Sequence, residues 1–143
     1  MNSRTTLRIA AAFAVVGLAC ATHTGAVGTA SMKAIEQPAD LILKMKNGTC
    51  GFVVRPPTIY ANRLRRDKVR WQVTNLCNED VTAKIDFPKD PFERCTREKM
   101  IAKGRTENMR CVVRSNSDNG SHPYDIYING KKAGDPDVEI WDN

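Results

Sequence analysis

The chain has 143 residues, of which 41% are hydrophobic, 27% charged and 6% aromatic, and its formal net charge is +6 at pH 7. This length suits one hydrophobic core, and the composition is that of a soluble globular protein, which excludes a disordered or collagen-like chain. A mildly basic chain suits an anionic partner such as a cell-wall polymer, a membrane surface or nucleic acid, but it requires none of them.

The first residues have the three-part pattern of a secretory signal peptide. Arg4 and Arg8 precede an uncharged apolar run, residues 9–19, and this run is shorter than the ~20 residues that span a bilayer. The small residues on either side of Cys20 fit a signal-peptidase site. We therefore predict a signal peptide over residues 1–21 and a periplasmic or secreted protein.

A lipid anchor is the alternative to a soluble exported protein. Leu18-Ala19-Cys20 is similar to a bacterial lipoprotein box, in which the cysteine is lipidated and becomes the first residue. Such boxes prefer Leu three residues before the cysteine, where this chain has Gly17. Membrane association is expected only if Cys20 is lipidated.

The folded domain is expected over residues 40–143. Residues 22–39 are small and polar without periodicity, which predicts a flexible lead-in. Two apolar runs, residues 41–46 and 49–54, then flank Asn47-Gly48. That pair favours the positive φ angles of a type I′ turn, so a β-hairpin is predicted here.

Alternation of apolar and polar residues predicts further strands along the chain. The pattern is clearest in residues 69–76 and 81–87. Shorter candidates are residues 58–60, 98–102, 106–114, 124–128 and 138–141. No segment has a sustained helical period. About seven to nine short strands with frequent turn signals indicate an all-β fold, a small Greek-key β-sandwich of the cupredoxin-like or immunoglobulin-like kind.

The strand order supplies a resemblance to a known family. Val69-Arg70-Trp71-x-Val73-x-Asn75 is followed by the strand over residues 81–87, the stretch 104–113, Tyr124-x-Ile126-x-Ile128 and Val138-x-Ile140. This order resembles the second half of cupredoxin-like sandwich domains. The resemblance rests on the pattern of strands and covers roughly half of the chain.

The resemblance implies a metal-free relative. Blue-copper members of that family bind copper through two His, a Cys and an axial ligand that is often Met. The cysteine position falls at Ile128 here, and no His stands near Asp80. Cleavage at a later site, after Ala30, would also remove His23. His122 would then be the one histidine left. We therefore predict that the protein has no cofactor.

Four cysteines follow the leader, namely Cys50, Cys77, Cys95 and Cys111. An even number of cysteines in an exported chain predicts two disulfides. The wide gaps between them argue against a four-thiolate zinc site, which is usually built from close pairs. Four cysteines allow three pairings, and all three stay open at this point.

The densest charge feature is a basic cluster formed by Arg63, Arg65, Arg66, Lys68 and Arg70. Such a cluster is either a solvated hairpin loop or an edge that binds an anion or a partner. It has no interleaved aromatic residues for stacking on bases, and an exported protein rarely meets nucleic acid, so nucleic acid is not expected as a partner. We predict that this hairpin is the contact surface.

No residue pattern indicates catalysis, so we predict that the protein is not an enzyme. His122 is expected on the surface of a polar loop, and Ser115, Ser117 and Ser121 near it carry no nucleophile signature. The tail has acidic residues that can pair with the basic cluster, namely Asp135, Asp137, Glu139 and Asp142.

These observations predict an exported, non-enzymatic β-sandwich module that binds a protein or an envelope component. The alternative is a periplasmic protein that handles copper or zinc. Its ligands would come from Met100, Met109, His122 or a reduced cysteine pair.

Overall fold

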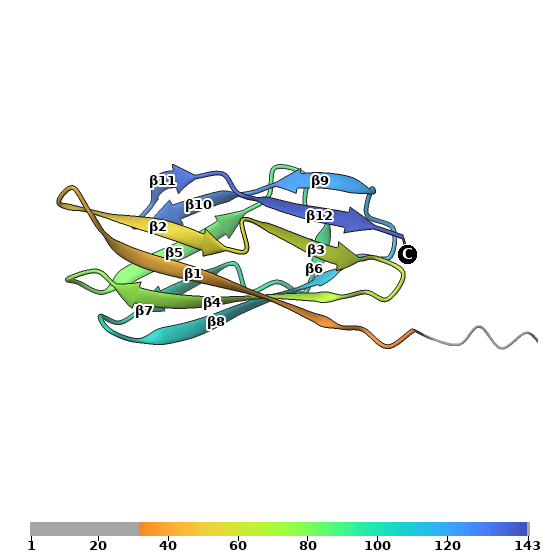
Figure 1. The fold of residues 1–143 in the computed structure, drawn as a ribbon, viewed down its shortest axis with the longest axis horizontal. Helices are drawn as coiled ribbons and strands as arrows, with labels where there is room; N and C mark the ends of the chain where they lie inside the picture. Colours follow the sequence, from red (N-terminus) through yellow and green to blue (C-terminus); the bar gives the residue numbers. More distant parts are fainter. Residues whose placement is uncertain (1–31, 143) are drawn as a thin grey trace, which may run out of the picture.

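The computed structural model describes residues 32–142, which form twelve β-strands in three sheets (Figure 1). The all-β class is thus confirmed. The predicted signal peptide, its Cys20 and residues 22–31 of the lead-in lie outside the described residues. Within the described part, no helix is long and apolar enough to cross a membrane.

The first layer is a five-stranded sheet. In spatial order its strands are β2 (Thr49–Arg55), β1 (Glu36–Lys46), β4 (Lys68–Leu76), β8 (Thr106–Val113) and β6 (Phe92–Glu93). β1 and β4 run parallel, and the other neighbours run antiparallel.

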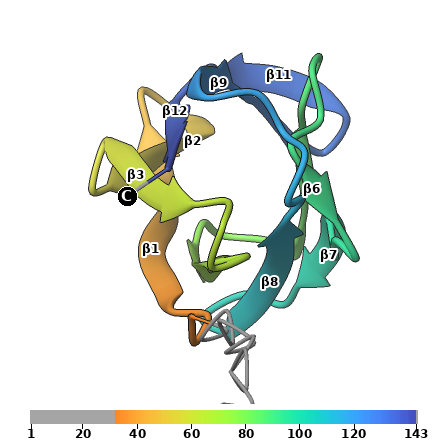
Figure 2. The same ribbon diagram turned by 90° about the vertical axis from the view of Figure 1, so that its right-hand side faces the viewer.

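Two smaller sheets cover the other side of the core. One is antiparallel and contains β11 (Lys131–Gly134), β10 (Asp125–Ile128), β5 (Val81–Asp86) and β7 (Glu98–Ile101). The other contains β3 (Thr58–Asn62), β12 (Asp137–Trp141) and β9 (Gly120–Pro123), with β3 parallel to β12. Tyr124 alone separates β9 from β10, so it joins the two sheets along the chain. Figure 2 shows the strands arranged around a common interior.

The predicted hairpin at Asn47-Gly48 is confirmed. β1 and β2 pair antiparallel from Lys46 and Thr49 outward, so the two residues between them form the turn. Their φ angles are 50° at Asn47 and 76° at Gly48. Both positions therefore have the left-handed backbone of a type I′ turn, which matches the twist of the flanking strands.

The sheet begins earlier, and contains more strands, than the sequence predicted. β1 starts at Glu36, so residues 36–39 of the predicted lead-in pair with β4, and Ala39 is buried. The extra strands are β6, with two residues, and β9 and β11, with four residues each. The predicted count of seven to nine was too low because segments this short contain no measurable period.

Four aromatic side chains form the centre of the core. Trp71 of β4 packs against Phe87, Phe92 and Tyr124 with ring-centroid distances of 6.1, 6.0 and 5.8 Å. The indole Nε1 of Trp71 donates a hydrogen bond to the Tyr124 hydroxyl at 3.1 Å. Since Trp71 lies in the large sheet and Tyr124 between the two small ones, this cluster connects all three sheets.

Two disulfides are present, as predicted, and the structure defines their pairing. Cys50 of β2 is bonded to Cys77 just after β4, and Cys95 is bonded to Cys111 of β8. Each joins a strand of the five-stranded sheet to a segment that lies outside the strands. Paired cysteines are typical of an oxidising environment outside the cytoplasm.

Candidate functional site

The basic cluster lies on a crossover between two sheets, and the predicted hairpin at this position was wrong. The segment leaves β3 in the three-stranded sheet and enters β4 in the five-stranded sheet, and these two strands do not pair. β3 pairs with β12 and β4 pairs with β1 and β8. Two successive strands suggest a hairpin when only the local sequence is considered, but here the partner strands are distant in the chain.

Asp67 is fully buried at the centre of this crossover. Its carboxylate accepts hydrogen bonds from Arg65 Nη2 at 2.8 Å, from the main-chain N–H groups of Ile35 and Asn62 at 3.0 Å each, and from Gln37 at 3.3 Å. Burial raises the pKa of this carboxyl, but the hydrogen bonds from Arg65 and the other donors outweigh it, so the pKa lies below its ordinary value. Asp67 therefore anchors both the crossover and the start of β1.

Arg63 connects the crossover to the acidic tail, and the predicted pairing between the two is confirmed. Its Nη2 lies 2.5 Å from Asp142 Oδ2, and its Nη1 donates to the Ser117 carbonyl at 2.5 Å. Asn119 donates to the same Asp142 carboxylate at 3.1 Å. Hydrogen bonds from Arg63 and Asn119 hold the pKa of Asp142 below its ordinary value.

The other arginines of the cluster also have acidic partners. Arg65 binds Asp67 as described above, Arg66 contacts Glu93, and Arg70 contacts Glu36. Lys68 is exposed. The positive charge predicted from the sequence is thus largely balanced by carboxylates that come from other strands.

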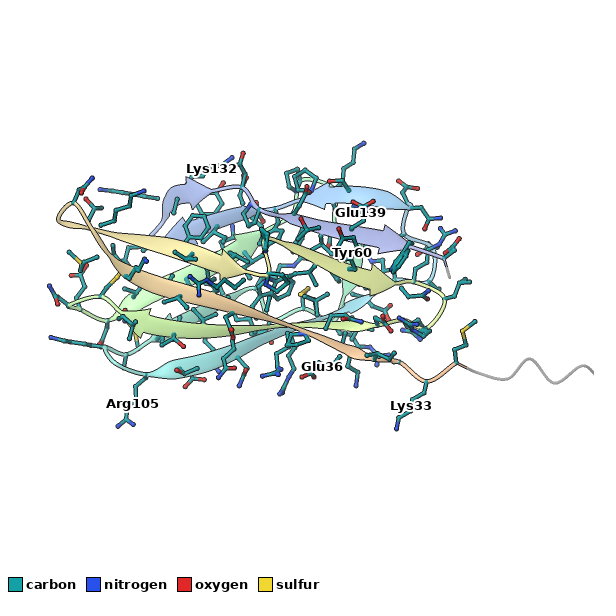
Figure 3. All side chains as sticks on the ribbon, viewed as in Figure 1. Lys33, Glu36, Tyr60, Arg105, Lys132 and Glu139 are labelled. Atoms are coloured by element: carbon teal, nitrogen blue, oxygen red, sulfur yellow. A yellow bond between two sulfur atoms is a disulfide. The ribbon has the colours of Figure 1, made fainter. Side chains whose placement is uncertain are left out.

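An exposed aromatic pair, which sequence reasoning missed, lies next to the crossover. The rings of Tyr60 on β3 and Trp141 on β12 are 6.1 Å apart, because the two strands run side by side. Tyr60 is 56% exposed, Trp141 42%, and Leu64 at the start of the crossover 55%. Figure 3 shows Tyr60 on the same face as Glu139, its register partner. We call the pair Tyr60 and Trp141 the aromatic surface.

His122 is buried, which corrects the prediction that it lies on the surface. It is 6% exposed because β9 turns it inward opposite Val138, and its Nε2 lies 2.9 Å from the Asp118 carbonyl oxygen. The neighbouring Ser121 hydroxyl donates to Asp137 at 2.5 Å. The structure therefore does not join this serine to the imidazole as a nucleophile and its base.

The residues predicted as metal ligands lie in different environments. Met109 is fully buried in β8, whereas Met100 on β7 is 68% exposed. All four cysteines of the domain are in disulfides. Within residues 32–142, no group of three or more His, Cys, Asp or Glu side chains is placed to hold a metal ion.

Comparison with known proteins finds similarity in structure alone. No family model and no curated protein matches the sequence. One crystal structure of a multicopper oxidase shares 17% identity at a TM-score of 0.48, with 74% of this chain and 42% of that chain covered.

Two further structures are similar to a lesser degree. The McoA multicopper oxidase 2F4 variant from Aquifex aeolicus shares 13% identity at a TM-score of 0.44, over 75% of this chain and 29% of that one. The multi-copper oxidase from Pseudomonas thermotolerans shares 15% at 0.42, over 77% and 30%. The chain thus spans less than half the length of these proteins. At these identities the similarity concerns the fold alone.

Proposed function

We propose that this chain is a non-enzymatic binding module of the periplasm or the extracellular space, whose partner is a protein or an envelope component. The aromatic surface is the observation that carries the proposal. Both rings are exposed, and the crossover with its arginines begins next to them, since the Arg63 N–H donates to the Trp141 carbonyl at 3.1 Å. Tyr, Trp and Arg are the side chains that contribute most to the free energy of binding at protein interfaces.

The contact surface extends from the arginines to this aromatic surface. Arg63 and Arg66 are already paired within the chain, so their main contribution is to orient an approaching partner. Tyr60 and Trp141 provide the apolar area that an interface would remove from water. Together they form an apolar centre with a charged rim, the usual arrangement of a binding interface.

Export is part of the proposal. The pattern of residues 1–21 and the two disulfides both support a location outside the cytoplasm. A lipid anchor at Cys20 is the alternative form of the same module.

Capture of partners from an envelope extract tests the contact surface. The oxidised wild-type protein, immobilised on beads, is compared with a Tyr60→Ala, Trp141→Ala double variant. We expect the variant to recover at least about tenfold less partner, because two exposed aromatic anchors are removed without change to the core. Leu76→Ala is the matched control, since Leu76 is 57% exposed on β4 in another sheet.

A charge-reversal variant tests the contribution of one arginine of the crossover without disturbing the others. Arg66→Glu changes a side chain that is 48% exposed, whereas a change at Arg65 would also disturb the buried Asp67. We expect Arg66→Glu to reduce capture mainly at low salt, where exposed charges act over longer distances.

Unchanged recovery by the Tyr60→Ala, Trp141→Ala double variant would overturn the contact assignment.

A further inference from the structure

A second candidate surface lies between two sheet edges. β2 is the last strand of the five-stranded sheet and β11 is the last strand of the four-stranded sheet, and each pairs with one strand only among those described. A cleft of about 470 Å³ separates them, lined by Thr49 and Gly51 of β2 and by Lys131 and Lys132 of β11. Figure 1 shows β11 beside β2 near the hairpin turn.

Phe52 closes one end of this cleft. An ideal Cβ built on Gly134 would lie only 2.4 Å from Phe52 Cζ, so the ring of β2 rests directly against the bare backbone of β11. On β2 the lining residues end at Gly51, just before Phe52, and on β11 they end at Ala133, just before Gly134. The two edges are therefore held together at one end and leave space at the other.

The cleft carries positive charge. Lys46, Lys131 and Lys132 line it together with a single acid, Glu79. Lys132 is neutralised by Asp125, with Nζ 2.7 Å from Oδ1, and it extends outward from β11 (Figure 3). Lys46 and Lys131 have no ion-pair partner within residues 32–142, and both are exposed. Their charges are thus available to an anionic group in the cleft.

The two edge strands offer a second kind of contact, which is main-chain hydrogen bonding to a peptide. A strand at the edge of a sheet presents main-chain N–H and C=O groups that have no neighbour, and an extended peptide can pair with them. A free phosphate or another small anion would use the lysines alone. A peptide strand with acidic side chains would use both the lysines and the main-chain groups.

We propose that the cleft between β2 and β11 binds an extended acidic segment of a partner protein. The segment pairs with a strand edge through its main chain and places carboxylates beside Lys46 and Lys131. This inference deepens the proposed function and rests on it, since it states the chemistry of a protein partner. The competing explanation is that the lysines keep the two edges from associating with other chains, a common use of lysine on edge strands.

The test uses a short synthetic peptide in which glutamate and threonine alternate, titrated into the oxidised protein by calorimetry. We expect saturable binding of this peptide and none of the peptide in which lysine replaces glutamate. An otherwise identical peptide that is N-methylated at alternate residues keeps its carboxylates but cannot pair with an edge. We expect it to bind at least about tenfold more weakly, because main-chain hydrogen bonds provide much of the affinity in strand addition.

Variants locate the site. Lys46→Glu with Lys131→Glu should weaken binding of the acidic peptide at least about tenfold, since two attractive charge contacts become repulsive. Lys103→Glu is the matched control because Lys103 is an exposed lysine in the loop between β7 and β8. Amide hydrogen exchange should show protection in β2 or β11 when the peptide is bound.

The results that would contradict the proposed peptide site are distinct from one another. Equal binding of the methylated peptide, or displacement of the peptide by inorganic phosphate alone, would show a simple anion site and overturn the proposal. Failure of all peptides to bind would assign the lysines to protection of the edges. The Tyr60→Ala, Trp141→Ala variant should bind the peptide normally, so a failed peptide test leaves the aromatic surface to be judged by capture of partners.

Discussion

A single buried carboxylate holds the region of the aromatic surface in place. Asp67 accepts hydrogen bonds from Arg65 on its own segment and from the main chain of Ile35, which precedes β1. The main-chain carbonyl of Asp67 also accepts from Val113 at the end of β8. Asp67 also accepts from the main-chain N–H of Asn62, the register partner of Trp141, so the position of the aromatic surface depends on this residue.

Asp67→Asn is expected to lower the free energy of unfolding by about 2 to 3 kcal/mol, because the amide nitrogen would face donors that need an acceptor. Urea denaturation at neutral pH measures the change. Asp40→Asn serves as the control, since Asp40 is exposed on β1, and it should alter the free energy by less than about 0.5 kcal/mol. Equal effects of the two substitutions would contradict the role assigned to Asp67.

Asp67 also makes the free energy of unfolding depend on pH. The pKa of Asp67 is lower in the folded protein than its ordinary value of 3.8. Its contribution is therefore fully present above that ordinary value and is lost as the pH falls through the folded pKa. The difference in unfolding free energy between the wild type and Asp67→Asn should shrink below about pH 4. A difference that stays constant down to pH 2 would show that Asp67 does not titrate as expected.

The strands differ in how well the sequence predicts them. β4, β5 and β8 are half-buried, so their alternation of apolar and polar residues is visible locally. The first residues of β1 contain Glu36, Gln37 and Pro38, and they form a strand only because β4 lies beside them in parallel. Such pairing between distant segments leaves no local pattern.

The candidate site shows the same limit. The basic cluster is recognisable in the sequence because its residues are close together. Its acidic partners Asp142, Glu93 and Glu36 lie 79, 27 and 34 residues away from the arginines that they bind. The contact between Tyr60 and Trp141 likewise depends on the parallel pairing of β3 with β12. Chemistry that is assembled by sheet topology is therefore available only from the structure.

The two disulfides link elements over loops of different length, and their removal is expected to destabilise the fold to different degrees. Cys50 and Cys77 are 27 residues apart, and Cys95 and Cys111 are 16 apart. Loop-closure entropy gives about 3.5 kcal/mol for the first and about 3 kcal/mol for the second. Paired Cys→Ala variants, compared by urea denaturation of the oxidised protein, measure both values. A loss below about 1 kcal/mol for either pair would show that its unfolded chain is already compact.

At the scale of the whole molecule, the three sheets are held by the aromatic core rather than by shared strands. Trp71 contributes from the five-stranded sheet, and Tyr124 lies where the two smaller sheets meet. Phe87 and Phe92 pack edge to face at 4.9 Å and fill the space beside them. Edge-to-face pairs add to the free energy of area burial. The hydrogen bond between Trp71 and Tyr124 also fixes how the layers face each other.

Tyr124→Phe removes the hydroxyl that accepts this bond and leaves the Trp71 N–H buried without an acceptor, so we expect a loss of about 1 to 3 kcal/mol. Burial raises the pKa of Tyr124 to about 12. A phenol whose pKa is raised in the folded state stabilises fully below its ordinary pKa of about 10, and that contribution is lost as the pH rises through the folded value. The wild type should therefore lose stability relative to Tyr124→Phe between about pH 10 and pH 12. Subtracting the ultraviolet titration of Tyr124→Phe from that of the wild type removes the signal of the other tyrosines, Tyr60 and Tyr127, and leaves the ionisation of Tyr124. A transition near pH 10 in this difference would mean that the core admits water at the junction of the sheets.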